Sequence, residues 1–333
     1  MSYVKIIVLA ALCALASEAT YADPPQIRVA WTAAPGELPP LLPFKKDVAT
    51  HWDKSYTYQD IHFQGTPQMI TAFAAGEIDL APIGYSTLGI AVTNARLDDM
   101  RIVADEIRDG VPGWHSVGFM ALKDGPVKMI GDLKGRVIAT NIIGSGGDVA
   151  MRYMLYRQHL EAKRDYTLIE AAYPNMKALL LEQKAALVPI ISVFGSDPEL
   201  KEKAFTLFTI RDALGETDLT VWTGRDRFLK KNRAAVVDFL EDYLRILRWY
   251  IDPANRAEAL KIVSAFMKQP VARFEKTTFN HEDFFRDPNG LPNVKALQTD
   301  VNAAETLGVI KQHLDVSKYL DLSYVREAAK RLQ

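Results

Sequence analysis

The feature that most constrains the fold of this chain is the regular alternation of short apolar strand segments with helical runs. Residues 66–84 show it clearly: the helical run TPQMITAFAA stops at Gly76, where a helix C-cap glycine belongs, and the strand segment IDLAPIG follows. The strand segment IRVAW at 27–31 opens the pattern, and residues 41–53 have helical spacing. Because strands that alternate with helices form mostly parallel sheets with helices on both faces, we predict an α/β fold.

The length of the chain predicts two such units. The chain has 333 residues, about twice the usual single-domain length. One set of strand and helix segments spans residues 27–106, and a second set of similar size spans residues 116–193. After the strand segment LTVWTGR at 219–225, the sequence becomes mainly helical, with a long run at 232–251. Each set has the content of one small doubly wound domain.

The first 22 residues are typical of a secretory signal peptide. Their apolar run, residues 6–16, is well short of the ~20 residues needed to cross a bilayer, and a short polar stretch ending at Ala22 follows it. We therefore predict cleavage near Ala22 and export. Cys13 is the only cysteine and lies inside this segment. The mature chain then lacks cysteine, which excludes disulfides, thiolate metal ligands and a cysteine nucleophile.

Charge and histidine spacing exclude two further classes of function. The 40 basic and 41 acidic residues give a formal charge of −1, which leaves no basic excess for binding nucleic acid. The six histidines show no HExxH or other metal-binding spacing, and only His115 is expected near a cleft. We expect the other five on the surface or as caps, and we predict no metal site and no cofactor.

A glycine-rich turn at 141–147, NIIGSGG, separates a strand segment from a helical run. Its glycines allow close approach of a ligand to the backbone, and a helix that begins there would direct unpaired N–H groups and the positive end of its dipole toward an anion. The spacing is neither a P-loop nor GxGxxG. A plain strand-to-helix turn capped by Ser145 or Asp148 explains the same residues equally well.

Several segments resemble one known family. They are IRVAW with its proline-rich sequel, FQGTPQMITAFAAGEIDLAPIG at 63–84, GDLKGRVIAT at 131–140, the turn at Gly144 and Ser145, and VWTGRDRFLKKNRAAVVDFLEDYLRILRWYIDP at 221–253. Together, in this order and over most of the chain, they resemble the periplasmic solute-binding proteins of ABC importers for nitrate, sulfonates and taurine. That family also contains binders of thiamine-pyrimidine precursors.

The resemblance implies two α/β lobes, each a mostly parallel sheet flanked by helices, joined by two crossing strands that act as a hinge. The crossings are expected near 113–116 and 217–221. The first lobe would comprise residues 23–114 and 220–333, and the second lobe residues 115–219. A cleft between the lobes would close around one small ligand, in agreement with the preference of ligands for interdomain clefts and for the carboxyl ends of parallel strands.

The first lobe supplies candidate ligand-binding residues at the ends of its predicted strands. Trp31 and Thr32 end the first strand and offer apolar area and an oxygen, although a core tryptophan is an equally good interpretation of Trp31. Gln64 and Gly65 follow the second strand, where Gln64 can donate and accept. The third strand is followed by the candidates Tyr85 and Ser86. Ser86 can simply cap a helix, but strand-end placement favours ligand contact.

The hinge and the second lobe supply the remaining candidates. Trp114 and His115 adjoin the first crossing. Tyr173, Phe194 and Trp222 lie at or near predicted strand ends, and each is as compatible with a core position as with a pocket wall. The glycine-rich turn would form the second half of the grip through its backbone donors. In relatives a histidine often stands where this chain has Asp148, so ligand identity is not implied. The candidates on this side are Trp114, His115, Asn141, Ser145, Gly146, Asp148, Tyr173, Phe194 and Trp222.

The resemblance implies a periplasmic, monomeric substrate-binding component of an ABC transporter, without catalytic residues. It would capture a small organic anion of the sulfonate or carboxylate type and deliver it to the permease in the inner membrane. The aromatic residues near strand ends favour an organic ligand over bare nitrate. Two alternatives stay open: an enzyme on the same scaffold acting in cofactor-precursor synthesis, and an exported ligand-sensing subunit.

Overall fold

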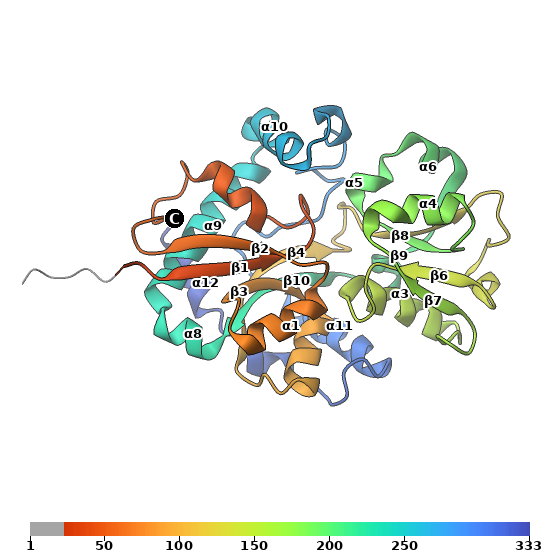
Figure 1. Cartoon of the computed structure of the whole chain (residues 1–333), viewed down its shortest axis with the longest axis horizontal. Coiled ribbons are helices and arrows are strands. Elements are labelled where there is room, and N and C mark those ends of the chain that lie inside the picture. The colour runs from red at the N-terminus through yellow and green to blue at the C-terminus, as the bar shows by residue number, and fades with distance from the viewer. Residues whose placement is uncertain (1–22) are drawn as a thin grey trace, which may run out of the picture.

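The computed structural model describes residues 23–333 and shows two α/β lobes side by side (Figure 1). The predicted signal peptide lies outside these residues. Among the helices described, none combines the length and the apolarity that a membrane span requires. The mostly parallel, two-lobe α/β architecture predicted from the sequence is confirmed.

The first lobe is built on a five-stranded sheet of order β2-β1-β3-β10-β4. Its strands β1, β2 and β3 are parallel to one another, and β10 is antiparallel to both β3 and β4. The strands are β1 (Gln26–Trp31), β2 (Thr57–His62), β3 (Leu80–Gly84), β4 (Met100–Asp109) and β10 (Thr217–Arg225).

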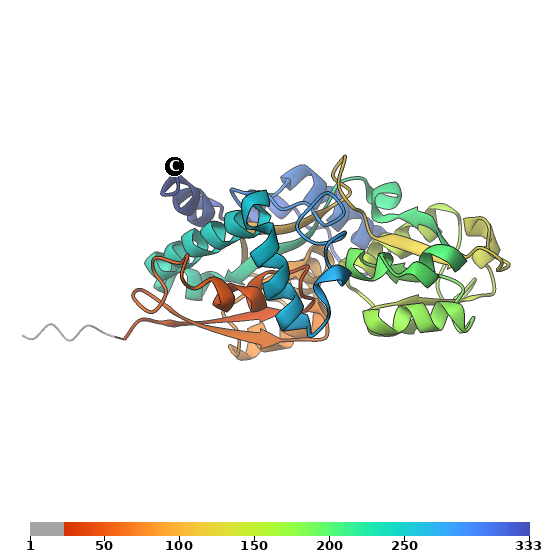
Figure 2. The same cartoon turned by 90° about the horizontal axis from the view of Figure 1, so that it is seen from above.

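Both faces of this sheet are covered by helices, which gives the first lobe two cores. On one face, Val29 and Trp222 pack with the long helix α9 and with α10 and α12; Figure 2 shows α9 running along one side of the strands. On the other face, Ala30 and Val221 pack with α1, α2 and α11. The covering helices are α1 (Thr66–Ala75), α2 (Tyr85–Gly89), α8 (Asp226–Lys231), α9 (Arg233–Ile251), α10 (Arg256–Met267), α11 (Val294–Thr306) and α12 (Ser323–Lys330).

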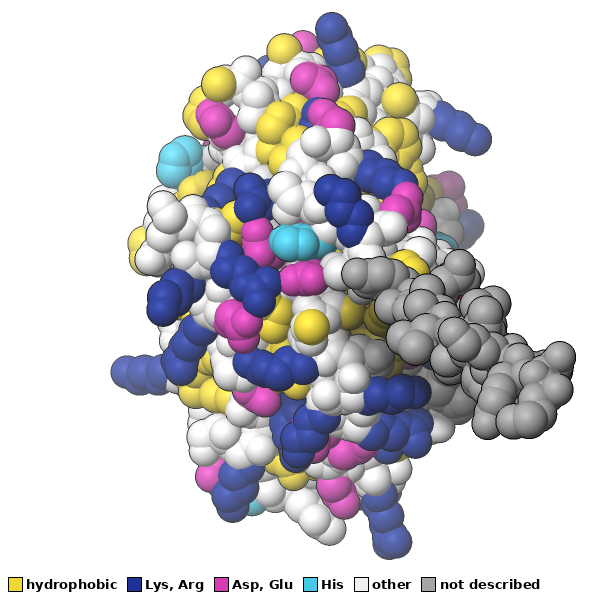
Figure 3. All heavy atoms as spheres, turned by 90° about the vertical axis from the view of Figure 1, so that its left-hand side faces the viewer, with side chains coloured by type: hydrophobic (Ala, Val, Ile, Leu, Met, Phe, Trp, Pro, Cys, Tyr) yellow, Lys and Arg dark blue, Asp and Glu magenta, His cyan; other side chains and the backbone are white. Residues whose placement is uncertain are grey.

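The outer end of the first lobe, on the side away from the second lobe, carries a mixed surface. Lys and Arg side chains are interspersed there with Asp and Glu, and neither sign forms a large continuous patch among the coloured side chains (Figure 3). This pattern agrees with the near balance of 40 basic and 41 acidic residues in the chain. On this face, the charge distribution therefore lacks the basic patch that typically marks a nucleic-acid-binding surface.

The second lobe contains the three strands β8-β5-β9 and the pair β6-β7, joined side by side by a bridge. Strand β5 is antiparallel to β8 and β9, whereas β6 is parallel to β7. At the bridge, the backbone N–H of Ala139 donates to Leu187 O at 2.9 Å and connects β6 to the start of β8. The strands are β5 (Gly118–Leu122), β6 (Val137–Thr140), β7 (Thr167–Glu170), β8 (Val188–Ile190) and β9 (Ala204–Thr209).

Helices also cover both faces of these strands. Helices α3 and α7 pack on one face with Phe119, and α4 and α6 pack on the other with Val188. The helices are α3 (Gly146–Arg157), α4 (Met176–Leu181), α5 (Ser192–Gly195), α6 (Pro198–Lys203) and α7 (Ile210–Leu214). In each lobe the single antiparallel strand, β5 or β10, is the first strand that the chain enters after passing from the other lobe.

Two local expectations differ from the structure. The helical spacing at 41–53 corresponds to a 3-10 helix, Pro39–Lys45, followed by turns. Pro43 lies inside it and has no N–H to donate, which prevents a regular α-helix. The helix after β3 is a short α-helix that continues as a π-helical turn, Ile90–Asn94. By contrast, Gly76 ends α1 in the left-handed conformation, with φ 71°, as its position in the sequence predicts.

Candidate functional site

Two adjacent chambers lie between the lobes. The inner chamber has a volume of about 90 Å³ and the outer chamber about 530 Å³. Both are lined by residues of the two lobes, and five residues line both chambers: Thr32, Ala33, Asn141, Tyr173 and Ile191. The outer chamber lies within the range of ~300–1,000 Å³ that is typical of small-molecule sites.

The first lobe contributes the carboxyl ends of its parallel strands. Trp31 and Thr32 follow from β1, Gly65 and Thr66 lie beyond β2, and Gly84 ends β3. Since the strands are parallel, these ends meet at one edge of the sheet, and that edge faces the second lobe. The sequence analysis predicted ligand-binding residues at these strand ends for the same reason.

The second lobe contributes the glycine-rich turn and the start of α3. Ser145 caps α3, with its Oγ accepting from the N–H of Asp148 at 3.3 Å and donating to Asn141 Oδ1 at 2.9 Å. Asn141, Ser145, Gly146 and Gly147 line the inner chamber. The structure therefore supports both interpretations of the turn, because one serine caps the helix while the first residues of that helix border the cavity.

The outer chamber is bounded mainly by apolar and aromatic side chains. The Trp31 ring lies 4.4 Å from the His62 ring and 6.0 Å from the Phe266 ring, centroid to centroid. Its Nε1 donates to Asp60 at 2.9 Å, which fixes the orientation of the indole. Phe194 and Met267 complete the apolar wall. A flat apolar body fits this surface better than a small inorganic ion.

Tyr85 and Ser86 join the lobes directly. The Tyr85 hydroxyl donates to Gly146 O at 2.8 Å, and Ser86 Oγ donates to Gly144 O at 2.8 Å. Both side chains are fully buried and neither lines a chamber. These two predicted ligand-binding residues thus contact the glycine-rich turn of the opposite lobe. The sequence analysis had expected the residues and the turn to hold the ligand between them.

Asp148 is occupied by its own neighbours. Its Oδ2 accepts from the N–H of Gly144 at 2.9 Å and pairs with Arg152 at 2.8 Å. Burial raises the pKa of this carboxyl, and Arg152 counteracts the effect. Asp148 is fully buried and lines neither chamber. The expected ligand contact through this acid has no support in the geometry.

Three other predicted residues lie away from the chambers. Trp222 is fully buried in the core of the first lobe, where its Nε1 donates to Glu106 at 2.6 Å. Trp114 packs on His281, with ring centroids 4.5 Å apart, at the first crossing. His115 packs edge-on against Phe284, and burial lowers its pKa. The predicted residues that do line the chambers are Trp31, Thr32, Gln64, Gly65, Asn141, Ser145, Gly146, Tyr173 and Phe194.

Several lining residues were not anticipated from the sequence. Glu37 is 3% exposed and lines the inner chamber, and its carboxylate accepts from Thr32 N at 2.6 Å and from Thr32 Oγ1 at 2.8 Å. Burial raises the pKa of Glu37 to about 7. Thr220 also lines this chamber, and Phe266 and Met267 come from α10. The proline-rich segment after β1 was the only local signal near Glu37.

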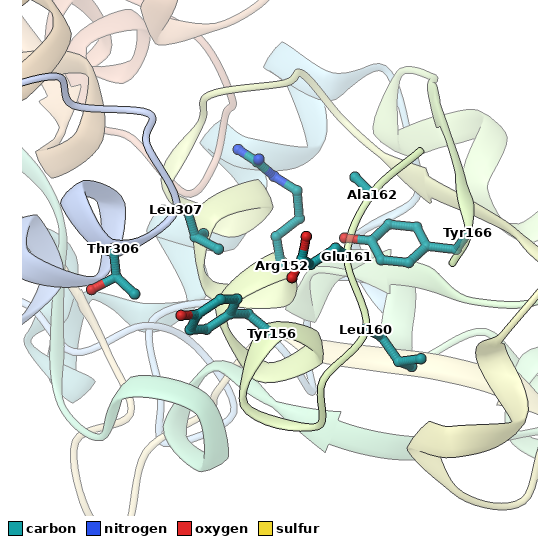
Figure 4. Close-up of a pocket in the computed structure, with 8 residues that line it drawn as sticks. All are labelled: Arg152, Tyr156, Leu160, Glu161, Ala162, Tyr166, Thr306 and Leu307. Atoms are coloured by element: carbon teal, nitrogen blue, oxygen red, sulfur yellow. The ribbon is translucent and has the colours of Figure 1, made fainter. Parts of the chain in front are cut away.

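A third cavity, of about 300 Å³, lies on another side of the lobe junction (Figure 4). It is lined by second-lobe residues that include Arg152 and Glu161, and by Thr306 and Leu307 at the end of α11. Arg152 forms the ion pair with Asp148 described above. This arginine is therefore already neutralised, and the cavity offers less to a charged ligand than its lining suggests.

Within residues 23–333, one group of side chains has a spacing that could suit a metal ion: His51, Asp238 and Glu241. His51 Nε2 lies 3.1 Å from a Glu241 oxygen. Asp238 pairs with Arg331 at 2.8 Å, and Glu241 pairs with Arg245 at 2.6 Å. Because these arginines already supply the positive charge that a metal would bring, the group is an ion-pair network outside the cleft.

Comparisons with known proteins agree with this architecture. Residues 114–256 match the family model described as NMT1/THI5 like. No curated protein matches the sequence. Among solved structures, the alkanesulfonate-binding protein SsuA from Xanthomonas axonopodis pv. citri, bound to MOPS, is similar at a TM-score of 0.69 and 18% identity, covering 90% of this chain and 99% of that chain.

Two further structures extend the comparison. The periplasmic nitrate-binding protein NrtA from Synechocystis gives a TM-score of 0.71 at 16% identity, covering 92% of this chain and 89% of that chain. The desulfurization enzyme DszB gives 0.62 at 10% identity, covering 92% and 99%. Identities this low show the fold alone. The chain thus has the periplasmic-binding-protein fold, with an NMT1/THI5-like region across residues 114–256.

Proposed function

We propose that this chain is the periplasmic solute-binding component of an ABC importer, which captures one small organic molecule between its lobes and delivers it to a membrane permease. The observation that carries the proposal is the pair of adjacent chambers lined by both lobes. A ligand held there contacts both lobes only when they are together, so its binding favours closure. The sulfonate- and nitrate-binding proteins with the same fold support this role.

The proposal includes the division of the chain. Residues 23–114 with 220–333 would move as one body and residues 115–219 as the other, with the hinge at the two connections between the sheets. In support, most buried apolar residues of each sheet pack with helices of the same lobe, and only a few, such as Val149 and Ile107, pack across the junction. At the hinge, Asp109 accepts from Val117 N at 2.9 Å and from Ser116 Oγ, across the first connection.

The ligand class predicted from the sequence, a sulfonate or carboxylate, stays a prediction. The start of α3 at the inner chamber favours an anionic or strongly polar group. The lining residues described for the two chambers include neither Lys nor Arg, whereas Glu37 and Glu170 are among them. The charge of the lining residues therefore favours an organic molecule that binds without an ion pair to a Lys or Arg side chain of the protein.

Thermal unfolding of the purified chain with a panel of ligands tests the proposal. We expect at least one small organic molecule to raise the unfolding temperature in a dose-dependent manner. Small-angle scattering with the same ligand should show a more compact molecule, because closure brings the lobes together. Stabilisation without any compaction across all stabilising ligands would contradict the binding-protein mechanism.

The enzyme alternative rests on the fold that this chain shares with DszB. Incubation of each stabilising ligand with the purified protein, followed by mass spectrometry, tests it. Recovery of unchanged ligand supports a binding role, and turnover would support an enzyme. The neighbouring genes distinguish a sensing role from a transport role. Permease and ATPase genes beside this one would favour transport.

A further inference from the structure

The inner chamber contains an acid whose charge is not balanced by any cation of the described chain. Glu37 takes part in none of the ion pairs of residues 23–333, and the negative charge of a second acid, Glu106, contributes to raising its pKa. Glu106 itself is engaged by Trp222, Tyr243 and the N–H of Leu38. A buried carboxylate without a cation is costly unless donors surround it.

The donors that the protein supplies to Glu37 leave room for more. Thr32 occupies one position on each oxygen, through its N–H at 2.6 Å and its Oγ1 at 2.8 Å, and the backbone N–H of Ala33 is a third donor to this carboxylate. A carboxylate has about four acceptor positions, so further donors can bind. Because Glu37 lines the inner chamber, a ligand in that chamber can supply them.

A second unpartnered group points to the same chamber. Thr220 lines it, is 7% exposed, and its Oγ1 has no hydrogen-bond partner within the described chain. A buried hydroxyl without a partner costs free energy, so it is a position where a ligand atom gains by arriving. Asn141 borders the chamber as well, and its Oδ1 is already used by Ser145.

The different volumes of the two chambers indicate which part of the ligand each can hold. The inner chamber, at about 90 Å³, holds only a small polar head. The outer chamber, at about 530 Å³, has the aromatic wall of Trp31, Phe194 and Phe266 and accommodates a ring or other apolar body. An anionic head beside Glu37 would place two negative charges together, which is unfavourable in a buried site.

Building on the proposed binding function, we infer that the ligand inserts a hydrogen-bond-donating nitrogen head, of the amidine, amide or amine class, into the inner chamber against Glu37. Its apolar body occupies the outer chamber. Thr220 can then accept a second N–H or donate to an oxygen of the head. The ligand is thereby distinguished from simple sulfonates and carboxylates, whose head groups only accept.

Three probes of nearly equal shape test this assignment: benzamidine, benzamide and benzoate. They share a phenyl ring and differ in whether the head only donates, donates and accepts, or only accepts. By calorimetry at pH 8, we expect benzamidine and benzamide to bind more tightly than benzoate by about 10- to 100-fold, the factor that charged hydrogen bonds supply. Equal or tighter binding of benzoate would overturn the inference.

Two substitutions locate the effect. Glu37→Gln keeps the shape of the side chain but removes its charge, and should weaken benzamidine by about 10- to 100-fold while benzoate binds no worse. Glu77→Gln, in an exposed acid of the first lobe that lines neither chamber, is the matched control and should leave both affinities within about twofold, since exposed charges contribute little. Unchanged benzamidine affinity in Glu37→Gln would refute the role of this acid.

The dependence of affinity on pH provides a second, independent readout. Benzamidine stays charged between pH 8 and 6, whereas Glu37, with its pKa raised to about 7, becomes protonated over this interval. Benzamidine affinity should therefore fall as the pH is lowered in the wild type and be flat in Glu37→Gln. The Arg286 guanidinium donates to the carbonyl of the adjacent Gly36 at 2.7 Å, and the titratable groups whose charge interacts with that of Glu37 are Glu106 and Tyr173. A slope that persists in Glu37→Gln would assign the titration to one of them and reject the inference.

The same probes separate the head-group assignment from the proposed function. If benzoate or a sulfonate binds and compacts the protein while benzamidine and benzamide do not, the binding function stands and the assignment of the head group is wrong. If no probe and no member of the wider panel binds, both are rejected.

Discussion

The hydrogen bond from Tyr85 to Gly146 provides the sharpest test of closure. It joins the lobes, with the hydroxyl 2.8 Å from the carbonyl oxygen, and Tyr85 is fully buried. In Tyr85→Phe the ring stays and the hydroxyl is lost, which leaves the Gly146 carbonyl without this donor. In an open molecule the same carbonyl would meet water, so the cost falls on the closed state alone.

The magnitude follows from the burial of the bond. Leaving a buried acceptor unsatisfied costs about 1–3 kcal/mol. This corresponds to a shift of about 5- to 150-fold between closed and open forms. If the free protein is mainly open, the full factor appears in the Kd of any ligand that needs closure. Isothermal calorimetry measures that Kd, and small-angle scattering of the ligand-free variant measures the shape.

A matched control separates closure from folding. Tyr56 is also a buried tyrosine, and its hydroxyl donates to Asp242 at 2.9 Å within the first lobe. Tyr56→Phe should lower the free energy of unfolding by a similar amount and leave ligand affinity unchanged. If Tyr85→Phe behaves like this control, with reduced stability and unaltered affinity, the bond does not take part in closure and the reasoning is refuted.

Three further predictions follow from the geometry. A Cβ on Gly65 would lie 2.3 Å from Cδ1 of Ile142 across the cleft. Gly65→Val should therefore keep the lobes apart and weaken ligand binding, and small-angle scattering measures the separation. Adding Ile142→Ala should restore closure, because it removes the atoms that clash. Trp222→Phe should lower the free energy of unfolding in urea by about 1–3 kcal/mol, because Glu106 loses a buried donor; a specific loss of ligand affinity would instead place Trp222 in the site. Burial raises the pKa of Asp109 from 3.8 to about 6, so the folded state binds more protons than the unfolded state over this interval and stability falls as pH rises from about 4 to about 6; Asp109→Asn should flatten that slope in urea titrations, and an unchanged slope would contradict the assignment.

Local sequence patterns predicted much of the fold for a physical reason. The periodic apolar positions that form β1, α1 and β3, and the glycine that ends α1, act within a few residues of each other, so they can be read from the chain alone. Pro43 shows the limit of such local patterns. The helical spacing around it was outweighed by the missing N–H, and a 3-10 helix formed.

The candidate site was only partly predictable. Strand ends such as Thr32 and Gly65 were found because the topology of a parallel sheet places them at one edge. Phe266 could not be found in this way, because it reaches the outer chamber from α10, far along the chain from β1. Trp222 was predicted as a candidate ligand-binding residue, but it lies in the core. A tryptophan on a strand can face either the core or a ligand, and its local sequence is the same in both cases.

The sequence by itself determined the alternation of elements, the two α/β lobes and the strand ends that face one another, because these depend on periodicity, turn glycines and chain order. Only the tertiary structure decided what each side chain at that edge contacts. It paired Asp148 with Arg152, joined Tyr85 and Ser86 to the opposite turn, and left Glu37 beside the inner chamber without a cation among the described residues. The physical reason is that burial and partnership arise between residues distant in sequence, and the charge a cavity presents is what remains after those partners are assigned.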